Sequence, residues 1–178
     1  MPDEHKILFT GTMGAGKTTA ISAVSAVKMV STEAVNTERS LFAKATTTVG
    51  LDYGEVSLED GSVLRLYGTP GQRRFEFMWK IIARGALGVI ILVDNSRPDP
   101  ISDIGIYLEN FRTLVEAGAV VIGVGRTETH SSPTTDDYYD YLAKRNLMLP
   151  VLEVDVRRGE DVLMLLDVLF SVLETADQ

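Results

Sequence analysis

The chain has 178 residues, a formal net charge of −8 and no cysteine. That length suits one domain with a sizeable hydrophobic core, and we expect residues 1–178 to form it. The acidic charge argues against nucleic acid as the main ligand, and the absence of cysteine excludes disulfides and thiol chemistry.

The first third of the chain is organised around a glycine-rich stretch that fits G-x-x-x-x-G-K-[ST], the pattern of a phosphate-binding loop. An apolar run over residues 6–10 predicts a buried strand before it, and residues 17 to about 28 predict an amphipathic helix after it. In such a loop Lys17 reaches the β- and γ-phosphates, and the Thr18 hydroxyl holds Mg²⁺. The residues predicted to bind the phosphates are Gly11, Thr12, Met13, Gly14, Ala15, Gly16, Lys17, Thr18 and Thr19.

Beyond this helix, residues 29–48 are polar and irregular, which indicates a functional loop. Residues 49–58 and 63–67 predict the two strands of a hairpin. Residues 73–84 predict a helix, and the continuous apolar run over 88–94 predicts a strand buried on both faces. The remaining predicted elements are a helix over 103–117, a strand over 119–124, a helix over 134–145, a strand over 150–154 and a helix over 160–175.

This alternation of strands and helices after one early hairpin is typical of an α/β doubly wound fold. We therefore expect a mostly parallel, six-stranded sheet with one antiparallel edge strand, the fold of a P-loop NTPase. Ligands bind such sheets at the carboxyl ends of the strands, and each motif described below follows a predicted strand.

With its motifs in this order, the chain resembles the small Ras-like GTPases, particularly bacterial members similar to the Arf and signal-recognition-particle-receptor β branch. The resemblance spans nearly the whole chain and rests on the spacing of five motifs, of which the phosphate-binding loop is the first and is intact. It implies a small-GTPase fold that binds GTP and GDP with Mg²⁺. Within the loop, Met13 stands where the family often has Gly, Ser or Asp. One interpretation is that Met13 obstructs the attacking water; the other is that its flexible side chain bends away.

The second motif, Thr46–Asp52, is similar to the Arf-type T-I-G-F-N. The resemblance implies that one threonine here binds Mg²⁺ and the γ-phosphate. The spacing to the following glycine favours Thr48, with Thr47 as the alternative. Loss of that contact on hydrolysis would release the loop.

The third motif, G-T-P-G-Q-R-R-F over 68–75, is similar to D-T-A-G-Q-E-x-F. The resemblance implies that Gly71 donates its N–H to the γ-phosphate and that Gln72 orients the attacking water. The family's Mg²⁺-contacting aspartate is replaced by Gly68. Asp52 and Asp94 are both candidates to take over its role.

The fourth and fifth motifs are the most altered. Residues 124–128 stand where the family has N-K-x-D, so Glu128 is expected to accept the guanine N1 and N2 protons and Arg126 to lie over the base. Gly125 lacks the side chain of the family's bracing asparagine. Residues 153–157 stand where the family has S-A-K, which implies that the Val156 N–H meets guanine O6 and that Arg157 packs beside the base.

The resemblance thus implies a GTP-binding molecular switch and a GTPase, with Gln72 and Lys17 as catalytic residues. The chain shows no arginine finger of its own, which predicts slow Mg²⁺-dependent hydrolysis and an activating partner. Relatives of this kind act with protein effectors and often with Roadblock-type proteins. Two alternatives stay open: a pseudo-GTPase that holds nucleotide without appreciable hydrolysis, and a P-loop ATPase or small-molecule kinase.

The sequence also predicts the cellular location of the protein. No run of eighteen apolar residues is present, and the first six residues are too polar and short for a signal peptide. Position 2 is proline and cysteine is absent, so myristoylation and attachment of lipid to sulfur are not expected. We therefore predict a cytoplasmic protein without a direct membrane anchor.

Overall fold

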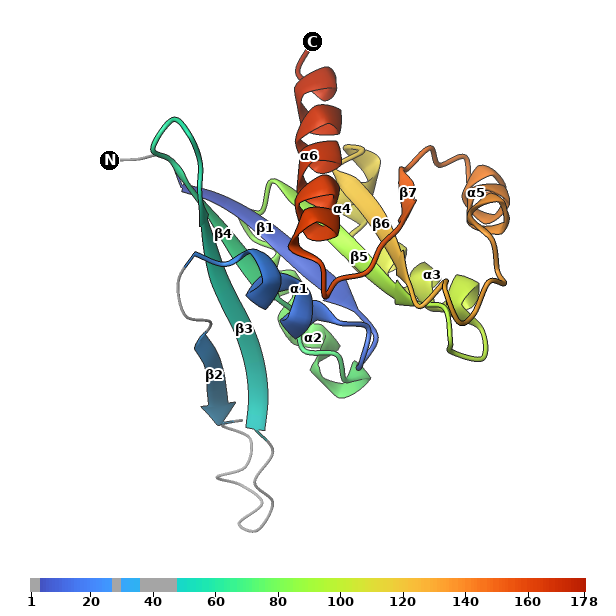
Figure 1. The fold of residues 1–178 in the computed structure, drawn as a ribbon, viewed down its shortest axis with the longest axis horizontal. Helices are drawn as coiled ribbons and strands as arrows, with labels where there is room; N and C mark the ends of the chain where they lie inside the picture. Colours follow the sequence, from blue (N-terminus) through green and yellow to red (C-terminus); the bar gives the residue numbers. More distant parts are fainter. Residues whose placement is uncertain (1–3, 27–29, 36–47) are drawn as a thin grey trace.

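The computed structural model describes residues 4–26, 30–35 and 48–178 (Figure 1). Among these residues, one sheet contains seven strands in the order β2-β3-β4-β1-β5-β6-β7. The pairs from β4 to β7 are parallel, whereas β3 runs antiparallel to both β2 and β4. The predicted doubly wound, mostly parallel α/β fold is thus confirmed. The strands are β1 Glu4–Gly11, β2 Val30–Val35, β3 Thr48–Ser57, β4 Val63–Gly68, β5 Gly88–Asp94, β6 Val120–Gly125 and β7 Val151–Glu153.

The sheet has one strand more than the six that were predicted, because part of the supposedly irregular stretch 29–48 forms β2. The antiparallel strand β3 consequently lies inside the sheet, and β2 forms the edge. An edge strand is held by backbone hydrogen bonds to a single neighbour, so it needs no apolar face. The sequence V-S-T-E-A-V has apolar residues only near its ends and gives no strand-like alternation.

Helices cover both faces of the sheet (Figure 1). The face of α1 and α6 shares one hydrophobic cluster, which includes Phe9, Ile21 and Leu165. The opposite face, covered by α2 to α5, has another cluster, which includes Trp79 and Tyr107. The helices are α1 Lys17–Val24, α2 Glu76–Ile82, α3 Pro100–Asn110, α4 Arg112–Glu116, α5 Thr135–Ala143 and α6 Gly159–Ala176.

Three helices differ from their predicted extents by more than two residues. α1 ends at Val24 instead of near residue 28, because the backbone N–H of Ala26 leaves the helix and donates to the carbonyl of Glu55 in β3. The helix predicted over 73–84 begins as a short 3-10 turn, η2 Arg73–Phe75. The helix predicted over 103–117 is divided into α3 and α4 at Phe111, whose side chain is buried in the core.

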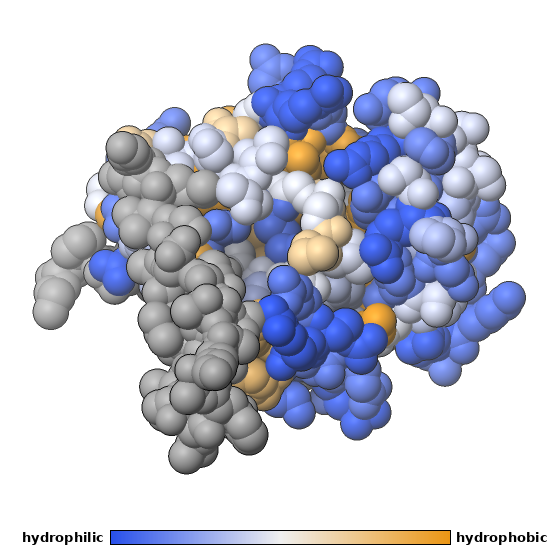
Figure 2. Space-filling view, turned by 90° about the horizontal axis from the view of Figure 1, so that it is seen from below, coloured by the Kyte–Doolittle hydropathy of each residue, from blue (hydrophilic) through white to orange (hydrophobic). Residues whose placement is uncertain are grey.

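Two surface observations complete the fold. None of the helices in the described ranges is both long and apolar enough to cross a lipid bilayer. Seen from below, the molecule presents mainly hydrophilic side chains to the right of the residues drawn in grey, with small hydrophobic areas between them (Figure 2).

Candidate functional site

A cavity of ≈ 660 Å³ lies where β1, β5 and β6 end, and segments far apart in the sequence line it. It brings together most of the predicted binding residues, whereas Gly11, Thr12 and Gln72 do not line it. Thr48 begins β3, but its side chain lies outside the described part of the chain, as do Thr46 and Thr47. The predicted residues that line the cavity are Met13, Gly14, Ala15, Gly16, Lys17, Thr18, Thr19, Gly71, Arg126, Glu128, Val156 and Arg157.

The phosphate-binding loop connects β1 to α1, as its pattern predicted. Two glycines have positive φ angles and no room for a side chain. At Gly11 (φ +148°) a Cβ would lie 2.3 Å from the carbonyl oxygen of Leu92, and at Gly16 (φ +101°) it would lie 2.6 Å from Cγ2 of Val156. The loop therefore passes closely against β5 on one side and the 154–157 segment on the other.

Lys17 is buried at the floor of this loop, with 7% of its surface exposed. Its Nζ donates to the carbonyl oxygens of Gly11 at 2.6 Å and Thr12 at 2.9 Å. Burial lowers the pKa of Lys17 to about 8, and the negative charge of Asp52 opposes that shift. A lysine held in this way places a titratable positive charge beside the backbone N–H groups of the loop.

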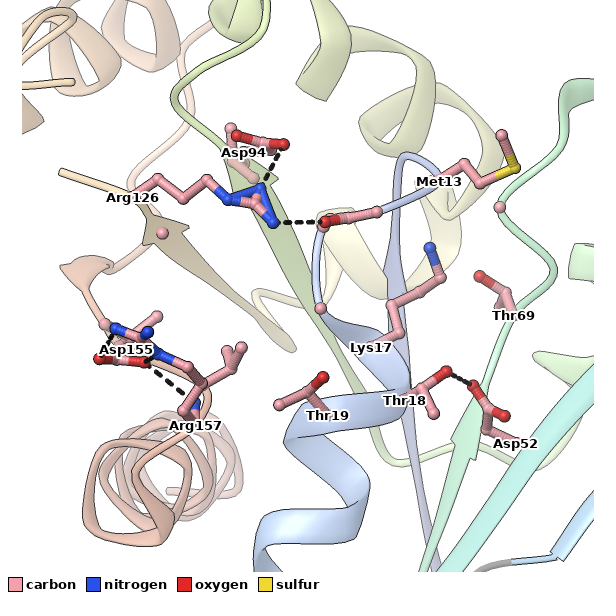
Figure 3. A pocket seen from close by; sticks show the side chains of 18 of the residues that line it. Met13, Lys17, Thr18, Thr19, Asp52, Thr69, Asp94, Arg126, Asp155 and Arg157 are labelled. Atoms are coloured by element: carbon pink, nitrogen blue, oxygen red, sulfur yellow. Dashed lines mark hydrogen bonds and ion pairs between the residues drawn. The ribbon is translucent and has the colours of Figure 1, made fainter. Parts of the chain in front are cut away.

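We call the group formed by Lys17, Thr18 and Asp52 the Thr18 end of the cavity; Gly68 of β4 lies directly beside it. Thr18 Oγ1 donates to Asp52 Oδ2 at 2.5 Å, as Figure 3 shows. Asp52 of β3 is the register partner of Gly68 in β4, the position at which the resemblance would place an aspartate. A Cβ on Gly68 would lie 3.1 Å from Cβ of Asp52, so the carboxylate of Asp52 occupies the space beside the missing side chain.

The residues at the Thr18 end match the chemistry of Mg²⁺ in phosphate-binding loops. A hydroxyl and a carboxylate oxygen in contact are hard ligands, which Mg²⁺ prefers. Mg²⁺ usually takes only one or two protein ligands there, together with water and phosphate oxygens. In ranges 4–26, 30–35 and 48–178, no group of three or more His, Cys, Asp or Glu could hold a metal ion by itself.

The segment after β4 is fixed by two buried hydrogen bonds. The hydroxyls of Thr69 and Thr10 lie 2.7 Å apart, and Trp79 Nε1 donates to the carbonyl oxygen of Pro70 at 2.8 Å. Gly71 follows directly and packs against the loop backbone, since a Cβ there would lie 2.8 Å from Cα of Met13. This packing explains why residue 71 must be glycine in the observed conformation.

Gln72 and Met13 are both exposed. Gln72 Oε1 accepts a hydrogen bond from Arg74 Nε at 2.6 Å, so its amide is engaged away from the cavity wall. The Met13 side chain lines the cavity and is 66% exposed, a position at its mouth. Of the two interpretations of Met13, this exposure favours a side chain that bends toward solvent.

We call the group formed by Asp94, Arg126, Glu128, Asp155 and Arg157 the Arg126 end of the cavity. Arg126 has a positive φ of 62° and extends its guanidinium between two segments (Figure 3). Its Nη1 donates to Asp94 Oδ2 at 2.7 Å, and its Nη2 donates to the Gly14 carbonyl oxygen at 3.2 Å. Asp94, one of the two candidates to replace the missing aspartate, therefore belongs to this end, and Asp52 alone of the pair contacts Thr18.

Asp155 and Arg157 form a two-point ion pair on the wall of the cavity. Arg157 Nε and Nη2 donate to the two carboxylate oxygens of Asp155 at 2.8 and 2.7 Å. These hydrogen bonds lower the pKa of Asp155 to about 2. Glu128 lies 3.9 Å from Arg157, and its own side chain is more than half exposed. The Arg126 end thus offers both carboxylate acceptors and guanidinium donors to a ligand.

For three residues of this site, the sequence-based prediction either named no role or left two alternatives open. Asp155 lies two residues before Arg157 within the fifth motif, a spacing that could have indicated the pair. The choice of Asp52 over Asp94 required the strand register, which no sequence pattern supplies. Asn95, the residue that follows β5, was not among the predicted site residues.

Comparisons with known proteins show which family and which relatives the chain is similar to. The model of a family described as "Conserved hypothetical ATP binding protein" matches residues 23–124, from within α1 to within β6. An uncharacterized protein of Methanocaldococcus jannaschii is 25% identical over 139 residues, 76% of this chain and 79% of its own. The Ras-related protein RabC of Dictyostelium discoideum is 26% identical over 96% of this chain and 84% of its own. The Ras-related protein RABA2a of Arabidopsis thaliana is 22% identical over 82% of this chain and 67% of its own.

Proposed function

This chain belongs to the family of conserved hypothetical ATP-binding proteins, and it is a nucleotide-binding P-loop protein related at low identity to Ras-like GTPases. From the second relationship and the arrangement of the site, we propose that it is a GTP-binding molecular switch. It hydrolyses GTP slowly, in a Mg²⁺-dependent reaction, and acts through a protein partner. One observation carries this proposal: a single cavity joins the buried Lys17 to the carboxylates and guanidiniums of the Arg126 end.

At the Thr18 end, the phosphates of the nucleotide meet Lys17 and the N–H groups of the loop. Thr18 and Asp52 would hold Mg²⁺, with Asp52 in the role of the aspartate that Gly68 has replaced. Bound there, Mg²⁺ neutralises charge on the β- and γ-phosphates. The contact between the Thr18 hydroxyl and the Asp52 carboxylate supports this assignment, because it brings two oxygen ligands within 2.5 Å of each other.

At the Arg126 end, we assign the base to guanine. Guanine presents two N–H donors, at N1 and N2, and the Glu128 carboxylate can accept both. Its O6 is an acceptor, for which the N–H of Val156 is the donor, and Arg157, held by Asp155, packs beside the base. Adenine has a donor at C6 and an acceptor at N1, so it would oppose the Val156 N–H and the Glu128 carboxylate and is the weaker fit.

Hydrolysis requires Gln72 to leave Arg74 and to turn toward the phosphates. We propose that the partner supplies this rearrangement, together with an arginine finger that adds positive charge at the γ-phosphate to that of Lys17. An effector would recognise the nucleotide state through Thr48 and Gly71. These residues would contact the γ-phosphate when GTP is bound and would lose that contact when GDP is bound. A Roadblock-type protein is a candidate for the partner.

A second function is favoured by one observation, the engagement of Gln72 by Arg74. In this alternative the chain binds nucleotide without appreciable hydrolysis and uses it as a structural element. Single-turnover hydrolysis of wild type, Gln72→Ala and Arg74→Ala separates the two. The switch predicts that Arg74→Ala is at least as fast as wild type and that Gln72→Ala is slower, whereas equally negligible rates in all three would support the alternative.

The proposal is tested by measuring affinities for GTP, GDP, ATP and ADP with Mg²⁺ on the full chain, with Lys17→Ala and Glu128→Gln as variants. We expect preference for guanine nucleotides, loss of all binding in Lys17→Ala, and loss of the preference alone in Glu128→Gln. Equal or tighter binding of adenine nucleotides by wild type would overturn the guanine assignment and favour an ATPase or kinase, in line with the description of the family.

A further inference from the structure

The loop that presents Arg126 and Glu128 runs from Gly125 to Pro133 and lacks a bracing asparagine at its start. We propose that Asp94 and Asn95, at the end of β5, are the positioning residues of this loop and thereby set the selectivity for the base. The inference rests on the proposed function, since it concerns the same site. It is carried by the hydrogen bonds of these two residues and by the register of β5 and β6.

Asn95 is 2% exposed and holds the loop near both of its ends. Its backbone N–H donates to the carbonyl oxygen of Gly125 at 3.1 Å. Its side-chain Nδ2 donates to the carbonyl oxygens of His130 at 2.7 Å and Pro133 at 3.0 Å. The remaining group, Oδ1, accepts from the buried hydroxyl of Tyr138 at 2.8 Å, which fixes the orientation of the amide. A buried amide whose groups are all engaged specifies one geometry.

Asp94 holds the first side chain of the loop. It is the register partner of Gly125, and its carboxylate contacts the next residue of the loop, Arg126. Oδ2 accepts from Arg126, and Oδ1 accepts from the backbone N–H of Ser96 at 2.9 Å. Because both oxygens are engaged, the direction of the Arg126 guanidinium is determined. Arg126 has a positive φ, which costs free energy and persists only where surrounding contacts impose it.

These contacts leave Glu128 between two anchored points. On one side Arg126 is held by Asp94, and on the other the His130 carbonyl is held by Asn95. The loop closes on itself as well, since the His130 N–H donates to the carbonyl oxygen of Arg126 at 2.9 Å. The backbone that carries Glu128 is therefore positioned by the last residue of β5 and the residue after it, both outside its own motif.

The test compares GDP with inorganic pyrophosphate, since the two share phosphates and differ in the nucleoside. Affinities for both are measured with Mg²⁺ on the full chain and on Asp94→Asn, Asn95→Asp and Tyr138→Phe. Asn95→Asp removes the two donors to the loop, whereas Tyr138→Phe leaves those donors in place. We expect Asp94→Asn and Asn95→Asp to weaken GDP binding about tenfold with pyrophosphate binding unchanged, and Tyr138→Phe to change the ratio of the two by less than about threefold.

Thermal stability is recorded for each variant, because a purely structural role would lower the melting temperature without changing the ratio of GDP to pyrophosphate affinity. An unchanged ratio in both Asp94→Asn and Asn95→Asp, in a wild type that binds GDP more tightly than pyrophosphate, would overturn this inference alone. A wild type that binds neither ligand would overturn the proposed function, and this inference with it.

Discussion

At the Thr18 end of the cavity, Gly68 stands where the resemblance places an aspartate, and at the Arg126 end, Gly125 stands where it places an asparagine. In both places the register partner on the neighbouring strand is an aspartate: Asp52 opposite Gly68, and Asp94 opposite Gly125. The partner strand is antiparallel in the first case and parallel in the second. At the Thr18 end, the carboxylate missing from β4 is thus present directly across the ladder, on Asp52, whereas at the Arg126 end the aspartate across the ladder contacts Arg126.

The two ends differ in the space around the glycine. A Cβ on Gly68 would lie 3.1 Å from Cβ of Asp52 and 3.2 Å from Cδ1 of Ile21, which is tighter than ordinary contact. A Cβ on Gly125 would lie 3.6 Å from the nearest atom, a carbonyl oxygen of Val93. At the Thr18 end, Asp52 and Ile21 therefore occupy the space into which a side chain at Gly68 would project. At the Arg126 end, the space beside Gly125 can still accept a side chain. The following predictions test this contrast, from the largest expected effect to the smallest.

Removal of the Asp52 carboxylate from the Thr18 end should have the largest effect on nucleotide binding. We expect Asp52→Ala to reduce the Mg²⁺ enhancement of GDP affinity about 10- to 100-fold, because one of the groups that would hold the ion is lost. Binding of GDP at a range of Mg²⁺ concentrations measures this. Asp94→Asn is the matched variant at the Arg126 end and should leave the Mg²⁺ dependence as in wild type. An equal loss in both variants would contradict the division of roles between the two aspartates.

Introducing the residues that the resemblance places at positions 68 and 125 should lower the stability of the protein at the Thr18 end and leave it nearly unchanged at the Arg126 end. We expect Gly68→Asp to lower the free energy of unfolding by about 1–3 kcal/mol, through overpacking and repulsion from Asp52. Gly125→Asn should change it by less than about 0.5 kcal/mol, since its Cβ meets only ordinary contacts. Denaturant titration of the two variants provides the comparison. Equal losses would show that the difference in space has no energetic consequence.

The pH dependence of binding should come from the Thr18 end alone. Phosphate binding needs the ammonium form of Lys17, and burial lowers the pKa of Lys17 to about 8. GDP affinity should therefore fall roughly fivefold between pH 8 and 9, whereas the guanidiniums of the Arg126 end stay charged. The free energy of unfolding should rise with pH over this range, because the folded chain binds fewer protons than the unfolded one. Lys17→Arg, which remains charged, should abolish the pH dependence of any residual binding.

The smallest effect is expected from Met13→Gly. Because the Met13 side chain is mostly exposed at the cavity mouth, its removal should change single-turnover GTP hydrolysis by less than about twofold. The rate is measured with the chain in excess over GTP. An acceleration of tenfold or more would instead support obstruction of the attacking water.

Much of the fold follows from local patterns in the sequence. The apolar run of β5 and the amphipathic periodicity of α6 fix those elements within a residue or two. The loop at Gly11–Thr19 likewise carries its own signal, because the conformation depends on glycines within the loop. The edge strand β2 has no such signal, since it is held by its neighbour's backbone.

The side chains that complete the site could not be predicted in the same way. Asp52 reaches Thr18, and Asp94 reaches Arg126, only because of strand register, which is a long-range property. Asn95 acts through the carbonyl oxygens of a loop more than thirty positions away, so its role is invisible to any local motif. Gln72 was expected at the cavity from its motif, but its hydrogen bond to Arg74 places it elsewhere in this conformation.

The measurement that tests the central claim most directly is an exchange of residues across the ladder. The Mg²⁺ dependence of GDP affinity is compared in wild type, Asp52→Gly and the double variant Asp52→Gly with Gly68→Asp, each with its melting temperature. If the carboxylate is interchangeable between register partners, the double variant regains most of the Mg²⁺ dependence that Asp52→Gly has lost. A double variant that is as stable as Asp52→Gly and equally insensitive to Mg²⁺ would contradict the claim.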